Sequence, residues 1–121
     1  MSTVTDFLSQ NPPQYLATLG LDGRPKVRPW QFMLEDDGRL YFCTSNQKPV
    51  FKEIQRQPHI EICAVGPGFS WLRLSGKVMF SKDLKLKARI QESNPLVKSI
   101  YHTPDNPAFE IFYLADAVAT I

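Results

Sequence analysis

The sequence lacks the features that mark several large classes of protein. No apolar run approaches the ~18 residues that a membrane-spanning helix needs, and the opening MSTVTDFLSQ lacks the basic and apolar regions of a signal peptide. Lysine and arginine form no block, and the formal net charge is only +2. We therefore expect neither a membrane nor a nucleic acid as a partner.

Cysteine and histidine are scarce. Two cysteines, Cys43 and Cys63, and two histidines, His59 and His102, stand at no metal-ligand spacing. This pattern favours reduced thiols, a cytoplasmic location and no metal site, with both histidines structural or at the surface. The sequence also contains no P-loop and no serine or cysteine nucleophile motif. The residues therefore identify no catalytic side chain.

The composition is that of an ordinary globular chain. Apolar residues make up 43% of the 121 positions and charged residues 21%, which predicts one domain over residues 1–121 with a real core. The predicted strands cover residues 15–19, 26–34, 39–44, 59–65, 70–80 and 109–114, with a continuation over 117–121. The predicted helices cover residues 3–10 and 47–57 and a third segment that starts at Ser81 or Asp83 and ends near 92, with a short helical piece ending at 101. The order of elements predicts a mainly β fold, a small closed or half-open antiparallel β-barrel with capping helices.

Two prolines disturb the predicted strand at 26–34. Pro25 and Pro29 each remove a donor from the hydrogen-bond ladder, so this strand should be an edge or carry a bulge. The backbone groups left free face a ligand, or the prolines protect an edge against unwanted pairing. The sequence alone leaves both readings open.

A candidate phosphate pocket lies between residues 24 and 49. Lys26 and Arg28 share one strand face about 7 Å apart. The next strand ends at Thr44-Ser45, and Asn46-Gln47-Lys48-Pro49 opens a helix with Ser45 or Asn46 as its N-cap. The N–H groups of a helix start attract anions. If the two strands pair, the cationic face meets this helix start.

The remaining candidates concern faces of the same elements. In the helix at 47–57, the spacing turns Val50, Phe51 and Ile54 inward and Lys52, Glu53 and Arg56 outward. On the strand at 70–80, Trp71 and Arg73 share the non-core face, an unusual pair for a solvated surface. Trp30 and Trp71 either flank a flat aromatic ligand or serve as core or dimer-contact residues. Cys43 lies beside the predicted pocket and is interpreted as a packing residue.

The succession YLATLGLDGRPKVRPW, LYFCTSNQKP, FKEIQRQPHIEICAV and WLRLSGKVMF resembles the small members of the pyridoxamine 5′-phosphate oxidase-like family. The resemblance extends from Tyr15 to Thr120. It implies a six-stranded antiparallel split β-barrel and a homodimer with FMN at its interface. The implied cofactor-binding residues come from four segments: Lys26, Val27, Arg28, Pro29 and Trp30; Cys43, Thr44 and Ser45; Gln47 and Lys48; and, from the second subunit, Trp71 and Arg73.

The resemblance has departures that bear on activity. Pro49 stands where the oxidases carry a second cation, and the C-terminal segment that completes their substrate site is not found before Ile121. We therefore expect an FMN-dependent oxidoreductase that passes electrons from a donor to a small organic acceptor, rather than an oxidase of pyridoxamine phosphate. Two alternatives stay open: a flavin-binding or sensing protein without turnover, and a haem-binding relative with His59 or His102 as axial ligand.

Overall fold

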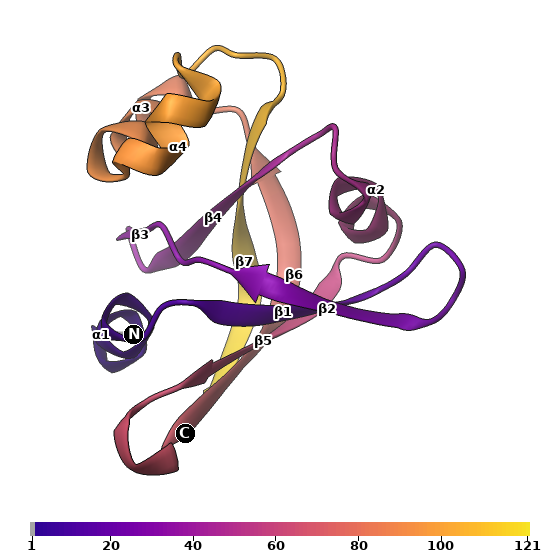
Figure 1. Cartoon of the computed structure of the whole chain (residues 1–121), viewed down its shortest axis with the longest axis vertical. Coiled ribbons are helices and arrows are strands. Elements are labelled where there is room, and N and C mark those ends of the chain that lie inside the picture. Colours follow the sequence, from indigo (N-terminus) through magenta and orange to yellow (C-terminus); the bar gives the residue numbers. More distant parts are fainter. Residues whose placement is uncertain (1) are drawn as a thin grey trace.

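One antiparallel sheet organises the chain, and the computed structural model describes residues 2–121. Its strands follow the order β2-β1-β5-β6-β7-β4-β3, with four α-helices and one 3-10 turn around it (Figure 1). The helices are α1 (Ser2–Gln10), α2 (Pro49–Arg56), α3 (Leu84–Ser93) and α4 (Pro95–Tyr101), and the 3-10 turn is η1 (Pro67–Phe69). The strands are β1 (Gln14–Leu19), β2 (Pro25–Trp30), β3 (Leu34–Asp36), β4 (Arg39–Ser45), β5 (His59–Val65), β6 (Trp71–Ser81) and β7 (Phe109–Thr120).

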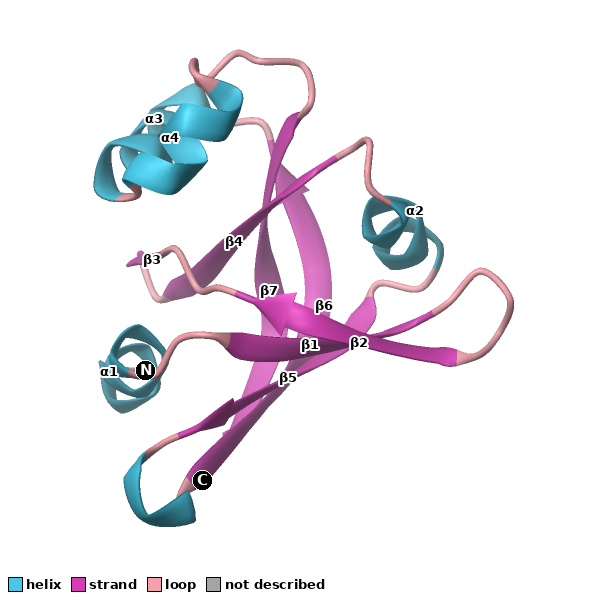
Figure 2. Ribbon diagram, viewed as in Figure 1, coloured by secondary structure: helices cyan, strands magenta, loops and turns pink. Residues whose placement is uncertain are grey.

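The predicted strand at 26–34 is wrong as a single element. It divides into β2 and β3, which form the two opposite edges of the sheet. The three residues between them form a loop that lies close to β1 and β4 (Figure 2). The Phe32 N–H donates to Gln14 Oε1 at 2.6 Å, and the Met33 N–H donates to Tyr41 O at 3.0 Å. The backbone therefore leaves one edge of the sheet and joins the other without a regular ladder between them.

Gln14 is a buried polar residue that fixes this loop. Its Nε2 donates to Leu8 O at 2.9 Å and to Asn11 O at 3.2 Å, while its Oε1 accepts from Phe32. One side chain thus connects the end of α1, the start of β1 and the loop at residues 31–33. Sequence patterning gave no sign of this role, because a glutamine at a strand start is ordinarily exposed.

The helices begin at identifiable caps. Asp83 caps α3 by accepting from the N–H groups of Lys85 and Leu86, and Asn94 caps α4 by accepting from Val97 N. The cap predicted for α2 is wrong. Lys48 holds the N-cap position without a side-chain cap bond, because Pro49 starts the helix and Ser45 Oγ accepts instead from Gln47 N at 3.1 Å.

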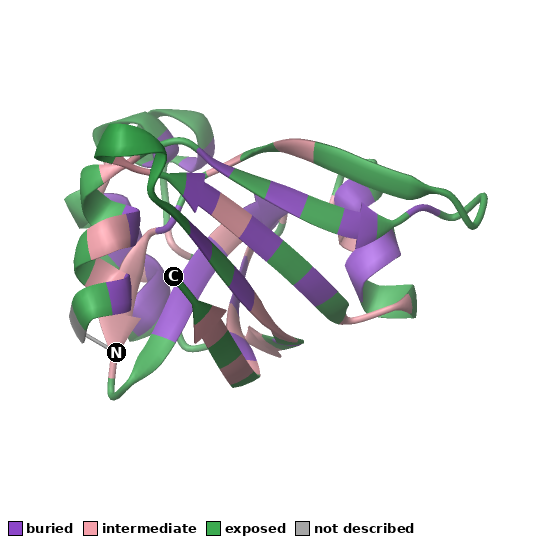
Figure 3. Cartoon of the chain, turned by 90° about the horizontal axis from the view of Figure 1, so that it is seen from below, coloured by how far each residue is buried: buried purple, intermediate pink, exposed green. Residues whose placement is uncertain are grey.

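Two apolar clusters hold the fold together. The larger is centred on Leu16, Phe42, Ile62 and Leu74 inside the curved sheet, and α2 adds Ile54 to it. The smaller lies between β4, β7 and the pair α3–α4. Buried and exposed residues alternate along β1, β5 and most of β6, as Figure 3 shows, so each of these strands gives one face to the core, whereas β4 is buried on both faces. The last strand is one continuous element rather than two pieces, and it pairs with β4 through its first half and with β6 along most of its length.

Candidate functional site

A cleft of about 640 Å³ lies where the end of β2, the middle of β4, the first turns of α2 and α4 and the segment before β1 come together. This size falls within the range of about 300–1,000 Å³ that is common for small-molecule sites. Its lining consists of Pro13, Arg28, Pro29, Trp30, Gln31, Met33, Cys43, Lys48, Pro49, Val50, Glu53, Leu96 and Val97.

Three charged side chains line the cleft, and two of them are paired. Arg28 Nη2 donates to Glu53 Oε1 at 2.9 Å, and Arg28 Nη1 donates to Thr18 Oγ1 at 2.8 Å and to Leu16 O at 3.3 Å. Thr18 also donates to Glu53 Oε1, at 2.7 Å. The prediction that Glu53 faces solvent is therefore wrong. Glu53 is only 6% exposed, because the half-buried cation Arg28 on β2 gives its carboxylate a partner.

Lys48 is the third charged group and stands at the start of α2. Its side chain is exposed and, within residues 2–121, forms no ion pair. Lys48 directly precedes Pro49, the first residue of α2. The backbone N–H groups of the first helical turn therefore lie beside a cation that has no ionic partner among the described residues. This end of the cleft can hold an anion.

The other walls are mainly apolar. Trp30 tilts against Phe112 with ring centroids 6.3 Å apart, and Met33, Val50, Leu96 and Val97 complete the wall. Trp30 Nε1 is buried and has no hydrogen-bond partner among the described residues. A buried donor without an acceptor is uncommon in native proteins, which distinguishes this indole from an ordinary packing residue. A flat aromatic molecule suits such a surface.

Cys43 lies on the cleft wall as a neutral thiol. Burial raises the pKa of Cys43 from its ordinary value of 9.0 to about 12, while the nearby charge of Lys48 opposes the rise only partly. A thiol that stays protonated is a poor nucleophile. The geometry agrees with the interpretation of Cys43 as a packing residue.

The structure brings only part of the predicted site together. Five of the predicted residues line the cleft: Arg28, Pro29, Trp30, Cys43 and Lys48. Lys26 does not, although it shares a strand face with Arg28, because its Nζ pairs with Asp22 Oδ2 at 3.1 Å in the hairpin. Thr44 and Ser45 are buried outside the lining, and Gln47 donates to the side chain of Asn46. Of the three cations predicted for the phosphate pocket, Arg28 and Lys48 line the cleft and Lys26 does not.

Sequence reasoning missed several lining residues. Pro13, Gln31, Met33, Leu96 and Val97 come from three segments that only the folded chain brings together, and no local pattern marks them. Glu53 did carry a signal. It lies between Val50 and Ile54 on the buried stripe of α2, and an acidic residue on such a stripe indicates a buried partner.

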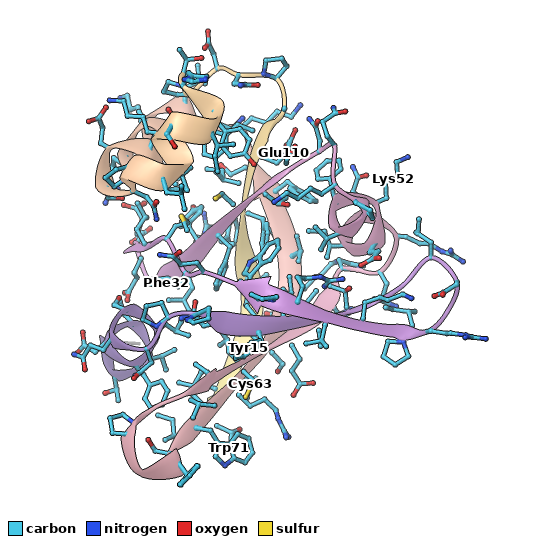
Figure 4. All side chains as sticks on the ribbon, viewed as in Figure 1. Tyr15, Phe32, Lys52, Cys63, Trp71 and Glu110 are labelled. Atoms are coloured by element: carbon cyan, nitrogen blue, oxygen red, sulfur yellow. The ribbon has the colours of Figure 1, made fainter. Side chains whose placement is uncertain are left out.

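Val27, Trp71 and Arg73 lie away from the cleft. Val27 points to the opposite side of β2 and is 70% exposed. Tyr15, Cys63 and Arg73 follow one another in register across β1, β5 and β6, and Trp71 lies further along the same face (Figure 4). We call this surface the outer face. It carries a shallow groove of about 300 Å³, and Arg73 lies over the Trp71 ring with Cζ 5.0 Å from its centroid.

Neither histidine reaches the cleft. His59 lines a separate hollow of about 410 Å³ with Lys77 and Asp116, and His102 is an exposed residue at the end of α4. No three His, Cys, Asp or Glu side chains in the described part of the chain are grouped as a metal site. None of the helices described is long and apolar enough to cross a membrane.

Comparison with known proteins places these features in a family. The sequence model described as "Pyridoxamine 5′-phosphate oxidase" matches residues 2–115. The comparison with curated proteins gave no match.

Solved structures give the same result for the fold. A NimC/NimA family protein from Clostridium acetobutylicum has 31% sequence identity and a TM-score of 0.91, with 99% of this chain and 85% of that chain covered. General Stress Protein 26 from Bacillus anthracis has 19% identity and a TM-score of 0.75, with 94% and 86% covered. An F420 reductase has 18% identity and a TM-score of 0.71, with 95% and 94% covered. The predicted mainly β, split-barrel fold is confirmed, with the second expected strand divided in two.

Proposed function

The chain belongs to the pyridoxamine 5′-phosphate oxidase family, and from this premise we propose that it binds FMN in the cleft and reduces a small organic acceptor. The observation that carries the proposal is the arrangement of the cleft. Arg28, Glu53 and Lys48 together give one net positive charge to a space whose other walls are the Trp30 indole and mainly apolar side chains. A phosphate and a tricyclic ring need this combination.

The residues present fit FMN in size and in chemistry. Lys48 and the start of α2 would hold the phosphate, and Trp30, Met33 and Val97 would face the ring. When bound, FMN supplies the transfer of electrons or hydride, and the protein positions it and limits the access of water. Cys43 takes no part as a nucleophile, because its pKa is about 12.

A second copy of the chain completes the site in this proposal. Tyr15, Val27 and Trp71 are large side chains left exposed on the outer face, and such a patch on a small domain favours a protein contact. Trp71 and Arg73 would then reach the cofactor from the partner subunit. This arrangement accounts for two predicted site residues that lie outside the cleft of their own chain.

Titration of the purified protein with FMN and riboflavin tests the binding proposal. The two ligands differ only by the phosphate, so riboflavin should bind at least about ten-fold more weakly, a difference of about 1.4 kcal/mol. Quenching of flavin fluorescence measures both affinities. Equal affinities would remove the phosphate end of the cleft from the proposal.

Stopped-flow reduction with NADH or NADPH separates an enzyme from a binding protein. Bleaching of the bound flavin absorbance on mixing supports a reductase, whereas a flavin that stays oxidised supports a binding or sensing role.

Titration with haem tests the haem-binding alternative. A Soret band that is lost on His59→Ala or His102→Ala would favour that alternative. Neither histidine lines the cleft, so we expect no such loss.

A further inference from the structure

The charges that line the cleft do not act independently. Arg28 and Glu53 form an ion pair whose side chains are 24% and 8% exposed, so water screens the pair only weakly. Lys48 has no ionic partner within residues 2–121. Two positive charges and one negative charge therefore leave the cleft with a net charge of about +1.

The pair is also fixed in position. Glu53 Oε1 accepts from both Arg28 and Thr18, and Arg28 reaches Thr18 Oγ1 and Leu16 O as well. These contacts join β2, β1 and α2 in a closed network. Three of the hydrogen bonds use N–H groups of the Arg28 guanidinium, which has only five to give. Two N–H groups remain, so most but not all of the fork is directed toward the protein rather than toward the cleft.

We propose that Glu53 sets the anionic charge that the cleft prefers. The Glu53 carboxylate neutralises Arg28, so Lys48 carries the net positive charge of the cleft. Arg28 then helps a phosphate to bind mainly because it offsets the repulsion between Glu53 and the phosphate. One net positive charge, that of Lys48, then remains for the anionic end of the ligand, which the proposed function identifies as the phosphate of FMN. This inference rests on the proposed function, because it assumes that the phosphate end of the ligand lies near Lys48.

Glu53→Gln tests the role of the charge, because glutamine keeps the size and the acceptor oxygen. The measurement is the ratio of the dissociation constants of riboflavin and FMN, obtained by fluorescence titration at low and high salt. We expect the ratio to rise about five-fold or more, with a smaller rise at high salt. Glu92→Gln is the matched control. It removes the same charge from an exposed pair with Lys98 and should leave the ratio unchanged.

Replacing both members of the ion pair by glutamine gives a second test, in which neither Arg28 nor Glu53 is left as an unpaired charge. Arg28→Gln alone should lower the ratio about five-fold or more, because it leaves the Glu53 charge beside the phosphate. The double variant Arg28→Gln/Glu53→Gln should return the ratio to within about two-fold of the wild type, because the original pair was already neutral. This variant decides the matter if Glu53→Gln fails to fold.

The outcomes separate the inference from the proposed function. If the double variant lowers the ratio as much as Arg28→Gln alone does, Arg28 binds the phosphate directly, and the inference is overturned. A wild type that prefers FMN, together with an unchanged ratio in a folded Glu53→Gln, would overturn it as well. A wild type that binds neither flavin would instead overturn the proposed function, and the inference with it.

Discussion

Cys43 illustrates how burial decides the chemistry of a single side chain. The thiol lines the cleft close to Lys48, a position that would suit a reactive cysteine if the group were ionised. Burial outweighs the lysine and keeps the thiol protonated at neutral pH. The residue therefore shapes the wall of the cleft and adds no charge to it.

The raised pKa of Cys43 predicts a dependence of stability on pH. The unfolded chain releases this proton near pH 9, whereas the folded chain holds it to about pH 12. The folded state binds more protons between these values, so the contribution of Cys43 is complete below pH 9 and is lost as the pH rises. The loss is about 1.4 kcal/mol per pH unit. Cys43→Ala should show a correspondingly flatter free energy of unfolding between pH 9 and 10.5.

Chemical denaturation across that pH range measures the effect. All other ionisable groups are common to the two proteins, so the comparison of the two slopes isolates Cys43. Identical slopes would mean that the thiol is already accessible to water in the folded protein.

Arg28 should affect FMN binding far more than an arginine outside the cleft. Arg28→Ala removes the partner of Glu53 and leaves an uncompensated carboxylate beside the phosphate, which should cost about 1.5–3 kcal/mol of FMN affinity. Arg39 is the matched control, because it is exposed and its Cζ lies 4.3 Å from the centre of the Tyr113 ring. Arg39→Ala should change the affinity by less than about 0.5 kcal/mol. Similar losses in a fluorescence titration would contradict the placement of the cleft.

At the scale of elements, the loop at residues 31–33 depends on Gln14. Gln14→Ala leaves the Phe32 N–H and the Leu8 carbonyl without their buried partner, which should lower the free energy of unfolding by about 2–4 kcal/mol. Gln55→Ala, on the exposed side of α2, should cost less than about 0.5 kcal/mol. Urea denaturation compares the two, and a small loss for Gln14→Ala would mean that water replaces its bonds.

Local signals predicted most of the elements but not this loop. Alternation and turn residues placed β1, β4, β5 and β6 within one or two residues, because their periodicity and turns are local properties. The break after Trp30 has another origin. It is set by hydrogen bonds from Phe32 to Gln14 and from Met33 to Tyr41, and both partners are distant or unremarkable in the sequence. The local pattern there predicts a single strand over 26–34, at an edge or with a bulge, and does not predict a break after Trp30.

The candidate site divides in the same way. Arg28, Trp30 and Lys48 could be predicted because each lies on an element whose position the sequence indicates. Lys26 lies outside the cleft because its side chain pairs with Asp22, four residues earlier. Sharing a strand face with Arg28 does not decide which partner a long side chain takes. The contribution of α4 depends on tertiary packing, so Leu96 and Val97 carried no local signal.

At the scale of the whole molecule, the outer face should join FMN binding to dimer formation. Trp71 is 46% exposed in the single chain, and a tryptophan buries about 150–250 Å² when a partner covers it. Trp71→Ala should weaken both the dimer and the binding of FMN, and FMN should stabilise the wild-type dimer by mass action. Lys82→Ala, an exposed residue just after β6, should change neither.

Analytical ultracentrifugation with and without FMN measures both effects. A wild-type protein that is monomeric at micromolar concentration and still binds FMN tightly would contradict the second-subunit contribution of Trp71 and Arg73. The cleft of one chain would then be sufficient to bind FMN.

The loop at residues 31–33 joins the two edges of the sheet, and its length limits the geometry of the cleft. The chain from Trp30 to Leu34 spans at most about 14 Å when fully extended, so these few residues limit how far β2 and β3 can separate. Trp30, Gln31 and Met33 also line the cleft. A change in the length of this loop should therefore alter the width of the cleft as well as the distance between the two edges of the sheet.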